Sequence, residues 1–95
     1  MFHPRYFEWD SEKANANFAK HGLDFSFAVQ VFDDAFRVTW DVSRPGDHEP
    51  RWKVAGRIGT SLHALVFTVR GDIVRVISAR RTNRSEERRY GDRSI

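Results

Sequence analysis

Three potentially cationic side chains are the first candidates for chemistry in this sequence, because they are expected to lie side by side on a sheet. Arg57, His63 and Arg80 fall in one cross-strand row. This register assumes a three-residue turn at Gly59–Ser61 and a two-residue turn at Gly71–Asp72. Directly opposed like charges destabilise a sheet, so the row predicts a phosphate-binding site. The alternative is that the arginines splay outward as edge protection or pair with nearby carboxylates.

Other side chains have the chemistry needed for proton transfer. His21 ends a predicted helix, where the alternative is a histidine that caps the helix or lies at the edge of the core. Glu87 and Tyr90 belong to a predicted C-terminal helix that approaches the polar end of the sheet. There Tyr90 is a candidate proton donor and Glu87 a candidate to orient an arginine. The alternative for this pair is a helix salt bridge and a packed aromatic ring.

The sheet that positions these residues is predicted from residues 51–80. Aromatic and β-branched residues dominate this stretch and two turns interrupt it, so we expect three successive strands in an antiparallel meander. One face, marked by Trp52 and Val66, is almost entirely apolar and is expected to be covered by helices. Leu65 and Phe67, on the other face, are expected to be largely buried because the central strand has neighbours on both edges.

Two helices are predicted before the meander and one after it. Asp10 is a predicted N-cap and Gly22 a left-handed C-cap for a helix from Ser11 to about His21, in which Phe18 is expected to anchor the core. The predicted fold class is α+β, with two N-terminal helices packed on an antiparallel sheet of about four strands and a short C-terminal helix. The other expected elements are an edge strand or tucked arm within residues 1–9, a helix from Asp24 to Phe32, a strand Phe36–Asp41, a loop Val42–Pro50, and a helix from Arg84 to about Tyr90 capped by Thr82 or Asn83.

Length and composition narrow the class of protein. At 95 residues the chain is expected to form one domain, residues 1–95. Its 16 Lys and Arg outnumber its 13 Asp and Glu and are concentrated after Arg51, which suggests a surface for a polyanion or else a self-complementary fold. It has no cysteine and no ligand spacing typical of a metal site, so no metal or other cofactor is expected. The chain lacks an apolar run long enough for a membrane span or a signal peptide, so we expect a cytoplasmic protein.

A set of landmarks recurs in a distinctive order along the chain. They are Phe7-Glu8-Trp9-Asp10, Lys13-Ala14, Asn17, Lys20-His21-Gly22, Phe25, Ala28, Val31-Phe32-Asp33-Asp34, Arg51-Trp52, Gly56, Phe67-Thr68, Arg70-Gly71, Arg75, Ile77-Ser78-Ala79-Arg80 and Glu87 to Tyr90. Together they resemble the BrnT family, over roughly Phe7 to Tyr90. The resemblance implies a toxin of a type II toxin–antitoxin module, with a fold like that of RelE ribonucleases and an RNA-cleaving activity that halts translation. It also implies a BrnA-like antitoxin partner, whose ribbon-helix-helix domain would bind operator DNA.

The resemblance gives the candidate residues specific roles. Cleavage of RNA without a metal needs a base for the ribose 2′-hydroxyl, an acid for the leaving 5′-oxygen and cations for the charge on the phosphorane. The alternative function is a module that binds RNA, or docks the antitoxin, without catalysis. The candidate catalytic residues are Arg57, Arg80, His21, His63, Glu87 and Tyr90. The candidate RNA-binding residues are Arg51, Lys53 and Arg75.

Overall fold

The computed structural model describes residues 4–93 of the chain. Five strands within this range form one mixed sheet. The strand order is β1-β5-β4-β3-β2, and β1 runs parallel to β5 while the other neighbouring strands are antiparallel. The α+β class is confirmed and the expected antiparallel strands are present as β2 to β5, but the sheet is not purely antiparallel, because the N-terminal arm adds a fifth, parallel strand. Residues 1–3 of that arm lie outside the described residues. The elements are β1 (Tyr6–Glu8), α1 (Ser11–His21), α2 (Phe25–Ala28), the 3₁₀ helix η1 (Val29–Asp33), β2 (Val38–Asp41), β3 (Trp52–Ile58), β4 (Ser61–Arg70), β5 (Ile73–Arg81) and α3 (Arg84–Arg93).

Helix α1 begins and ends where its capping residues predict. The Asp10 carboxylate accepts a hydrogen bond of 3.0 Å from the Lys13 amide. At the other end, Gly22 adopts a φ of 66° and its amide bonds to the Phe18 carbonyl. The second predicted helix is α2 continued by η1, so its apolar side through Phe32 is kept while its hydrogen bonds tighten to the 3₁₀ pattern.

The turn between β3 and β4 decides which side chains share a face of the sheet. It contains two residues, Gly59 and Thr60, rather than the predicted three, and Gly59 has the positive φ of 61° that tight hairpin turns require. His63 therefore lies opposite Gly56 instead of Arg57. Because side chains alternate between faces, this shift moves the β4 side chains to the opposite face from the one predicted.

The face that the helices cover is consequently different from the predicted one. It carries Trp52 together with Leu65 and Phe67, which are 0% and 2% exposed. The predicted burial of these two residues is confirmed. Val66, however, lies on the uncovered face opposite Lys53, so its predicted place under the helices was wrong.

The core lies between this covered face and the α2–η1 segment. Phe32 packs edge-on against Phe67 with 5.2 Å between ring centroids, and Phe25 is 2% exposed. Gly56 allows η1 to approach β3 closely, since a Cβ atom there would lie 2.7 Å from the Val31 carbonyl oxygen. The sheet and η1 are therefore held together at a position that only glycine accommodates without rearrangement.

Helix α1 docks on the edge of β5 through Asn17 rather than through Phe18. The Asn17 side chain donates to the Ala79 carbonyl at 2.9 Å and accepts from the Ala79 amide at 3.1 Å. Asn17 is buried and Phe18 is 51% exposed, so the prediction that Phe18 anchors the core was wrong. Strand β1 pairs with residues 73–75 of β5. Further along the same edge, the Asn17 side chain makes the hydrogen bonds that the Ala79 amide and carbonyl would otherwise lack.

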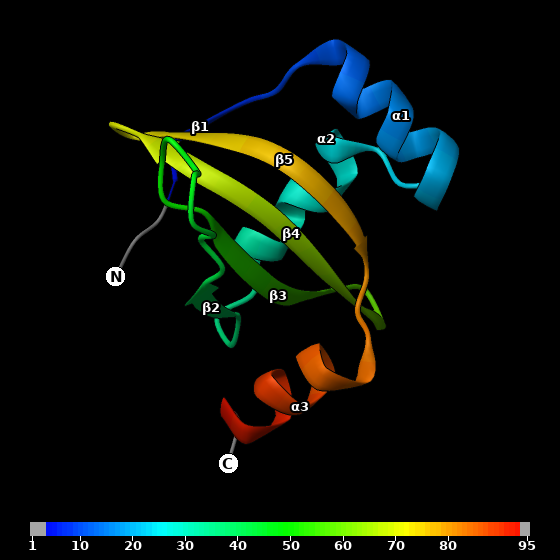
Figure 1. Ribbon diagram of the computed structural model, residues 1–95. Coiled ribbons are helices and arrows are strands. Elements are labelled where there is room, and N and C mark those ends of the chain that lie inside the picture. The colour runs from blue at the N-terminus through cyan, green and yellow to red at the C-terminus, as the bar shows by residue number, and fades with distance from the viewer. Residues whose placement is uncertain (1–3, 94–95) are drawn as a thin grey trace.

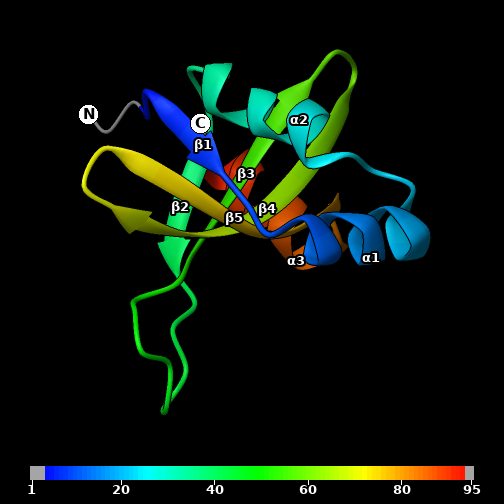
Figure 2. The same ribbon diagram turned by 90° about the horizontal axis from the view of Figure 1, so that it is seen from above.

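The second face of the sheet, which we call the open face, carries Lys53, Val66, Arg75 and Ser78. Figure 1 looks onto this face, with α2 behind the strands and α3 below them. Figure 2 shows the loop of residues 42–51 projecting from the sheet on the side away from α2. Across residues 4–93, no helix has the length and apolar character needed to cross a membrane.

Candidate functional site

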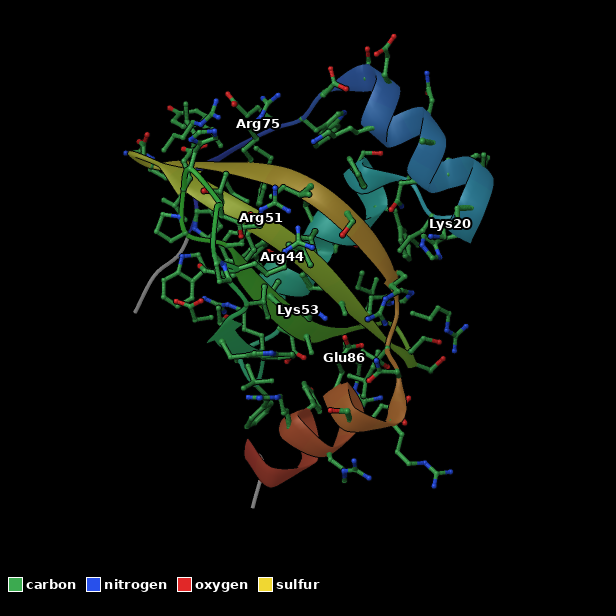
Figure 3. The ribbon with its side chains drawn as sticks, viewed as in Figure 1. Lys20, Arg44, Arg51, Lys53, Arg75 and Glu86 are labelled. Atoms are coloured by element: carbon green, nitrogen blue, oxygen red, sulfur yellow. The ribbon has the colours of Figure 1, made fainter. Side chains whose placement is uncertain are left out.

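A buried carboxylate holds two cations at the α3 end of the open face. The Glu86 side chain is 3% exposed and accepts a hydrogen bond of 2.8 Å from Lys53. Arg80 forms two hydrogen bonds with the same carboxylate, Nη1 to Oε1 at 2.8 Å and Nη2 to Oε2 at 2.7 Å. This two-bond geometry fixes the plane of the Arg80 guanidinium as well as its distance. Figure 3 shows Glu86 next to Lys53, at the edge of the sheet.

The first turn of α3 positions Glu86. The Asn83 side chain accepts from the Glu86 amide at 2.9 Å, and the Asn83 amide donates to the Glu86 carboxylate at 2.9 Å. This reciprocal pair is a capping box, so the spacing of Asn83 and Glu86 was the sequence signal for a residue that the sequence-based candidates omitted. Glu87, the residue expected to orient an arginine, is exposed and accepts a hydrogen bond of 3.1 Å from the Thr82 hydroxyl.

The Glu86 carboxylate is charged at neutral pH. Burial opposes its ionisation, but hydrogen bonds from Arg80, Lys53 and the Asn83 amide outweigh burial and hold the pKa of Glu86 below its ordinary value. Glu86 is therefore unable to donate a proton at neutral pH. Its geometry suits it to orient Arg80 and Lys53, which are both sequence-based candidates.

A second cluster joins β3, α3 and the residue that follows η1. The Asp34 carboxylate accepts from the Tyr90 hydroxyl at 2.7 Å and from the Arg57 amide at 2.8 Å through the same oxygen. The Arg57 guanidinium lies 5.6 Å from the centre of the Tyr90 ring, within the range of a cation–π interaction. Glu86 and Tyr90 are four residues apart on α3 and so lie on the same side of the helix.

The two acidic groups of this cluster are held in opposite protonation states. Burial raises the pKa of Tyr90, and its hydrogen bond to Asp34 raises it further. For Asp34, burial opposes ionisation, but hydrogen bonds from the Arg57 and Phe36 amides and from Tyr90 outweigh it and lower the pKa. At neutral pH Tyr90 is therefore protonated, with its proton directed at an ionised Asp34.

Basic side chains continue along the open face, away from α3. Figure 3 shows them following one another from Glu86 toward the far end of the sheet. Arg75 is paired with Glu8 at 2.8 Å, whereas Arg51 lies 3.6 Å from Asp47, too far for a hydrogen bond. Arg44, from the loop of residues 42–51, was not among the sequence-based candidates. We call this set the basic strip, and it consists of Lys53, Arg44, Arg51 and Arg75.

A comparison with protein families identifies the chain. The model of the family described as the ribonuclease toxin, BrnT, of type II toxin–antitoxin systems matches residues 9–86. The chain belongs to the BrnT family. A comparison with curated protein sequences finds no match. The BrnT resemblance seen in the landmarks is confirmed, so the chain is a ribonuclease toxin that acts on RNA and has an antitoxin protein as its partner.

The predicted row of three cations does not form in this BrnT toxin. His63 lies on the covered face opposite Arg81, with its ring 5.6 Å from that of Phe27. Burial, followed by the nearby charge of Arg81, lowers the pKa of His63. Arg57 and Arg80 both contact residues of α3, so the structure brings these two cations to the same helix but removes the histidine from them.

The remaining sequence-based candidate of the BrnT site is His21. His21 ends α1 and is exposed. Within residues 4–93, no group of three or more His, Asp or Glu side chains gathers in a way that could hold a metal ion.

Proposed function

We propose that this BrnT toxin cleaves RNA endonucleolytically and without a metal ion, with the strand along the basic strip and the scissile phosphate at Arg80 and Arg57. In this reaction the ribose 2′-hydroxyl attacks the adjacent phosphorus and the bond to the 5′-oxygen breaks. The protein must stabilise the negative charge that develops on the phosphorane. The observation that carries the proposal is the pairing of Arg80 with the buried carboxylate of Glu86 through two hydrogen bonds.

This pairing prepares Arg80 for transition-state stabilisation. A guanidinium that is already oriented needs little reorganisation when charge develops on the substrate. Of its five N–H donors, two bond to Glu86 and one to the Arg81 carbonyl, so five minus three leaves two donors for phosphate oxygens. The Arg80 side chain is 34% exposed, so part of it is open to solvent. Glu86 is therefore proposed as a positioning residue for Arg80.

Arg57 is proposed as the second cation at the scissile phosphate. It is exposed, and its guanidinium lies against the Tyr90 ring. Because Tyr90 is 8% exposed and gives its hydrogen bond to Asp34, we assign it the role of holding Arg57 in place of the proton donation expected from sequence. Asp34 accepts hydrogen bonds from the Tyr90 hydroxyl and the Arg57 amide, so it is also proposed as a positioning residue.

We propose His21 as the base that accepts the proton of the ribose 2′-hydroxyl, with water supplying the proton that the leaving 5′-oxygen takes up. Imidazole is the side chain most often used for general acid–base catalysis, and His21 is exposed at the end of α1. His63 is given a structural role instead, because it is buried on the face opposite the basic strip. Glu87 has no role in the proposal, since Glu86 is the carboxylate that contacts Arg80.

The proposed partner is a BrnA-like antitoxin in the cytoplasm. Its ribbon-helix-helix domain would bind operator DNA, so the toxin would contact this DNA only through the antitoxin. A helix or segment with acidic side chains would complement the cations of the open face and block access to Arg57 and Arg80. The Arg57→Glu substitution should therefore weaken the toxin–antitoxin complex in a pull-down or titration experiment. An unchanged affinity would mean that the antitoxin binds elsewhere.

The proposed reaction is tested on a defined RNA with the purified toxin in the presence of a chelator. We expect cleavage to continue, and mapping of the RNA ends by primer extension to give internal sites. Complete inhibition by the chelator would contradict the metal-free mechanism. Binding of the RNA without any cleavage, with or without added divalent ions, would instead support the non-catalytic alternative.

A further inference from the structure

A pocket of about 280 Å³ lies on the open face between the loop of residues 42–51 and the central strands. It combines basic and apolar walls. Its basic wall is the middle of the basic strip, and its apolar wall comes from the central and outer strands of the meander. The lining residues are Val42, Arg44, Arg51, Lys53, Val66, Ile77 and Ser78.

The basic wall of this pocket contains uncompensated positive charge. No carboxylate lines the pocket among the described residues, and within residues 4–93 the Arg44 guanidinium has no hydrogen-bond or ion-pair partner. In the described part of the chain, the one acidic group near the Arg51 guanidinium is the Asp47 carboxylate, at 3.6 Å. Lys53 is the member that is neutralised, by Glu86. Figure 3 shows Arg44 beside Arg51, with Lys53 next along the strip. An anion between the two arginines would relieve their repulsion.

The loop holds both arginines in place. The Arg51 amide donates to the Ser43 hydroxyl at 2.8 Å, and the Val42 amide donates to the Arg51 carbonyl at 2.9 Å, which closes the neck of the loop. Beyond the neck, the Arg44 amide donates to the Asp47 carboxylate at 2.8 Å. The backbone that carries the two guanidinium groups is therefore held by hydrogen bonds within the loop itself.

The apolar wall suits a nucleobase. Val66 and Ile77 are partly buried on the open face and present apolar atoms beside the two arginines. A base can lie against such a surface only when it is not stacked and paired within a duplex. Arginine guanidinium planes also stack on free bases, and they bind phosphate through paired donors. The combination of walls therefore fits one nucleotide of a single strand.

We propose that this pocket binds one nucleotide of single-stranded RNA, with its phosphate on Arg44 and Arg51 and its base against Val66 and Ile77. This inference rests on the proposed function, and it adds a pocket for one nucleotide at Arg44 and Arg51 and a preference for unpaired RNA. A neighbouring pocket of about 170 Å³ shares Arg51 and Ile77 and extends the path toward the other end of the sheet. It is also lined by Thr68, whose buried hydroxyl has no hydrogen-bond partner among the described residues.

The test measures RNA affinity by fluorescence anisotropy, using an RNA blocked at every 2′-hydroxyl by methylation so that it stays intact. Arg44→Ala should raise the Kd for the single strand by about fivefold and reduce the slope of log K against log salt by about 0.7, the loss of one phosphate contact. Arg44→Lys should keep the slope but recover only part of the affinity, because an ammonium lacks the planar fork. The same RNA annealed into a duplex should bind more weakly and respond little to Arg44→Ala.

Arg5→Ala is the matched control, because it removes the same charge from an exposed arginine beside β1, at the outer edge of the sheet. Equal effects of Arg44→Ala and Arg5→Ala, or equal effects on single strand and duplex, would overturn the nucleotide pocket. So would an Arg44→Ala variant that binds RNA normally but loses the antitoxin. Cleavage of unmodified RNA by the parent protein reports on the proposed function separately: a pocket that fails while cleavage persists leaves that function standing. Arg44-dependent binding without cleavage would overturn the function and keep the pocket.

Discussion

The Glu86 carboxylate and the Arg80 guanidinium are joined by two hydrogen bonds, of 2.8 and 2.7 Å, although one residue lies on α3 and the other on β5. The pair is asymmetric, since the acid is 3% exposed and the base 34% exposed. The carboxylate therefore serves as a fixed support, and the guanidinium can still reach a substrate. Arg80→Ala and Glu86→Gln should separate these roles.

Arg80→Ala should lower the rate of RNA cleavage by roughly a hundredfold or more, because charge on the phosphorane loses its main stabilising group. RNA affinity should change little, since the basic strip is left intact. Arg80→Lys should rescue little activity. Single-turnover cleavage and anisotropy give the two quantities, and thermal melts confirm folding. Full activity of Arg80→Ala would remove this residue from the site.

Glu86→Gln should strengthen RNA binding while it slows cleavage. The amide keeps the shape of the side chain but removes the charge that neutralises Lys53 and Arg80, so RNA should bind several-fold more tightly at low salt. Cleavage should slow by about tenfold or more because Arg80 loses its orientation. The free energy of unfolding should fall by about 1–3 kcal/mol. A Glu87→Gln variant is the control, and a rate loss as large as that of Glu86→Gln would contradict the assignment.

Tyr90→Phe should lower the free energy of unfolding by about 1 kcal/mol, because the hydrogen bond to Asp34 is lost while the ring that supports Arg57 is kept. We expect the cleavage rate to change by less than about tenfold, since the phenol is assigned no proton transfer. A general acid contributes about a hundredfold or more. A loss of that size, with the pH–rate profile losing its basic limb, would show that Tyr90 is the proton donor after all.

His63 should make the protein less stable in mild acid. Its pKa is lowered in the folded state, so below the ordinary histidine value of about 6.5 the unfolded chain binds more protons than the folded one. Stability is therefore full above this value and declines as the pH falls toward the lowered pKa. Asp34 and Glu86 contribute losses only at lower pH, because their pKa values are also lowered. Urea melts of a His63→Leu variant should show a flatter profile between about pH 6.5 and 5; an unchanged profile would exclude His63 as the cause.

Gly56→Ala should destabilise the fold by about 1–3 kcal/mol or more, because the added Cβ would lie 2.7 Å from the Val31 carbonyl oxygen. Gly91→Ala is the matched control. Among residues 4–93, no atom outside the neighbouring residues and the backbone of α3 lies within 4 Å of its added Cβ, and the position is in α3, so this variant should be stabilised by about 0.5–1 kcal/mol. Thermal melts of the two variants should shift in opposite directions. A shift of the same sign and size would mean that η1 yields easily at this contact.

Local features of the chain were predictable because they depend on residues close in sequence. The caps of α1 at Asp10 and Gly22, the extents of the meander strands and the start of α3 all follow from capping and alternation patterns. The burial of Leu65 and Phe67 was also predicted correctly, but the reason is the register, which places both side chains on the face that the helices cover. The order of landmarks likewise carried the BrnT assignment, since it does not depend on the register of the sheet.

The tertiary structure alone decided two kinds of relationship: those that depend on the exact register of the sheet, and contacts between residues far apart in the sequence. A two-residue turn at Gly59 and Thr60 moved His63 to the covered face, because a shift by one reverses every side chain of a strand. Asp34 and Tyr90 meet across 56 residues, and no periodicity in the sequence encodes that contact. The orientation of Arg80 likewise comes from the way α3 returns to the sheet after β5, which places Glu86 beneath a guanidinium that the sequence shows only as one of many positive charges.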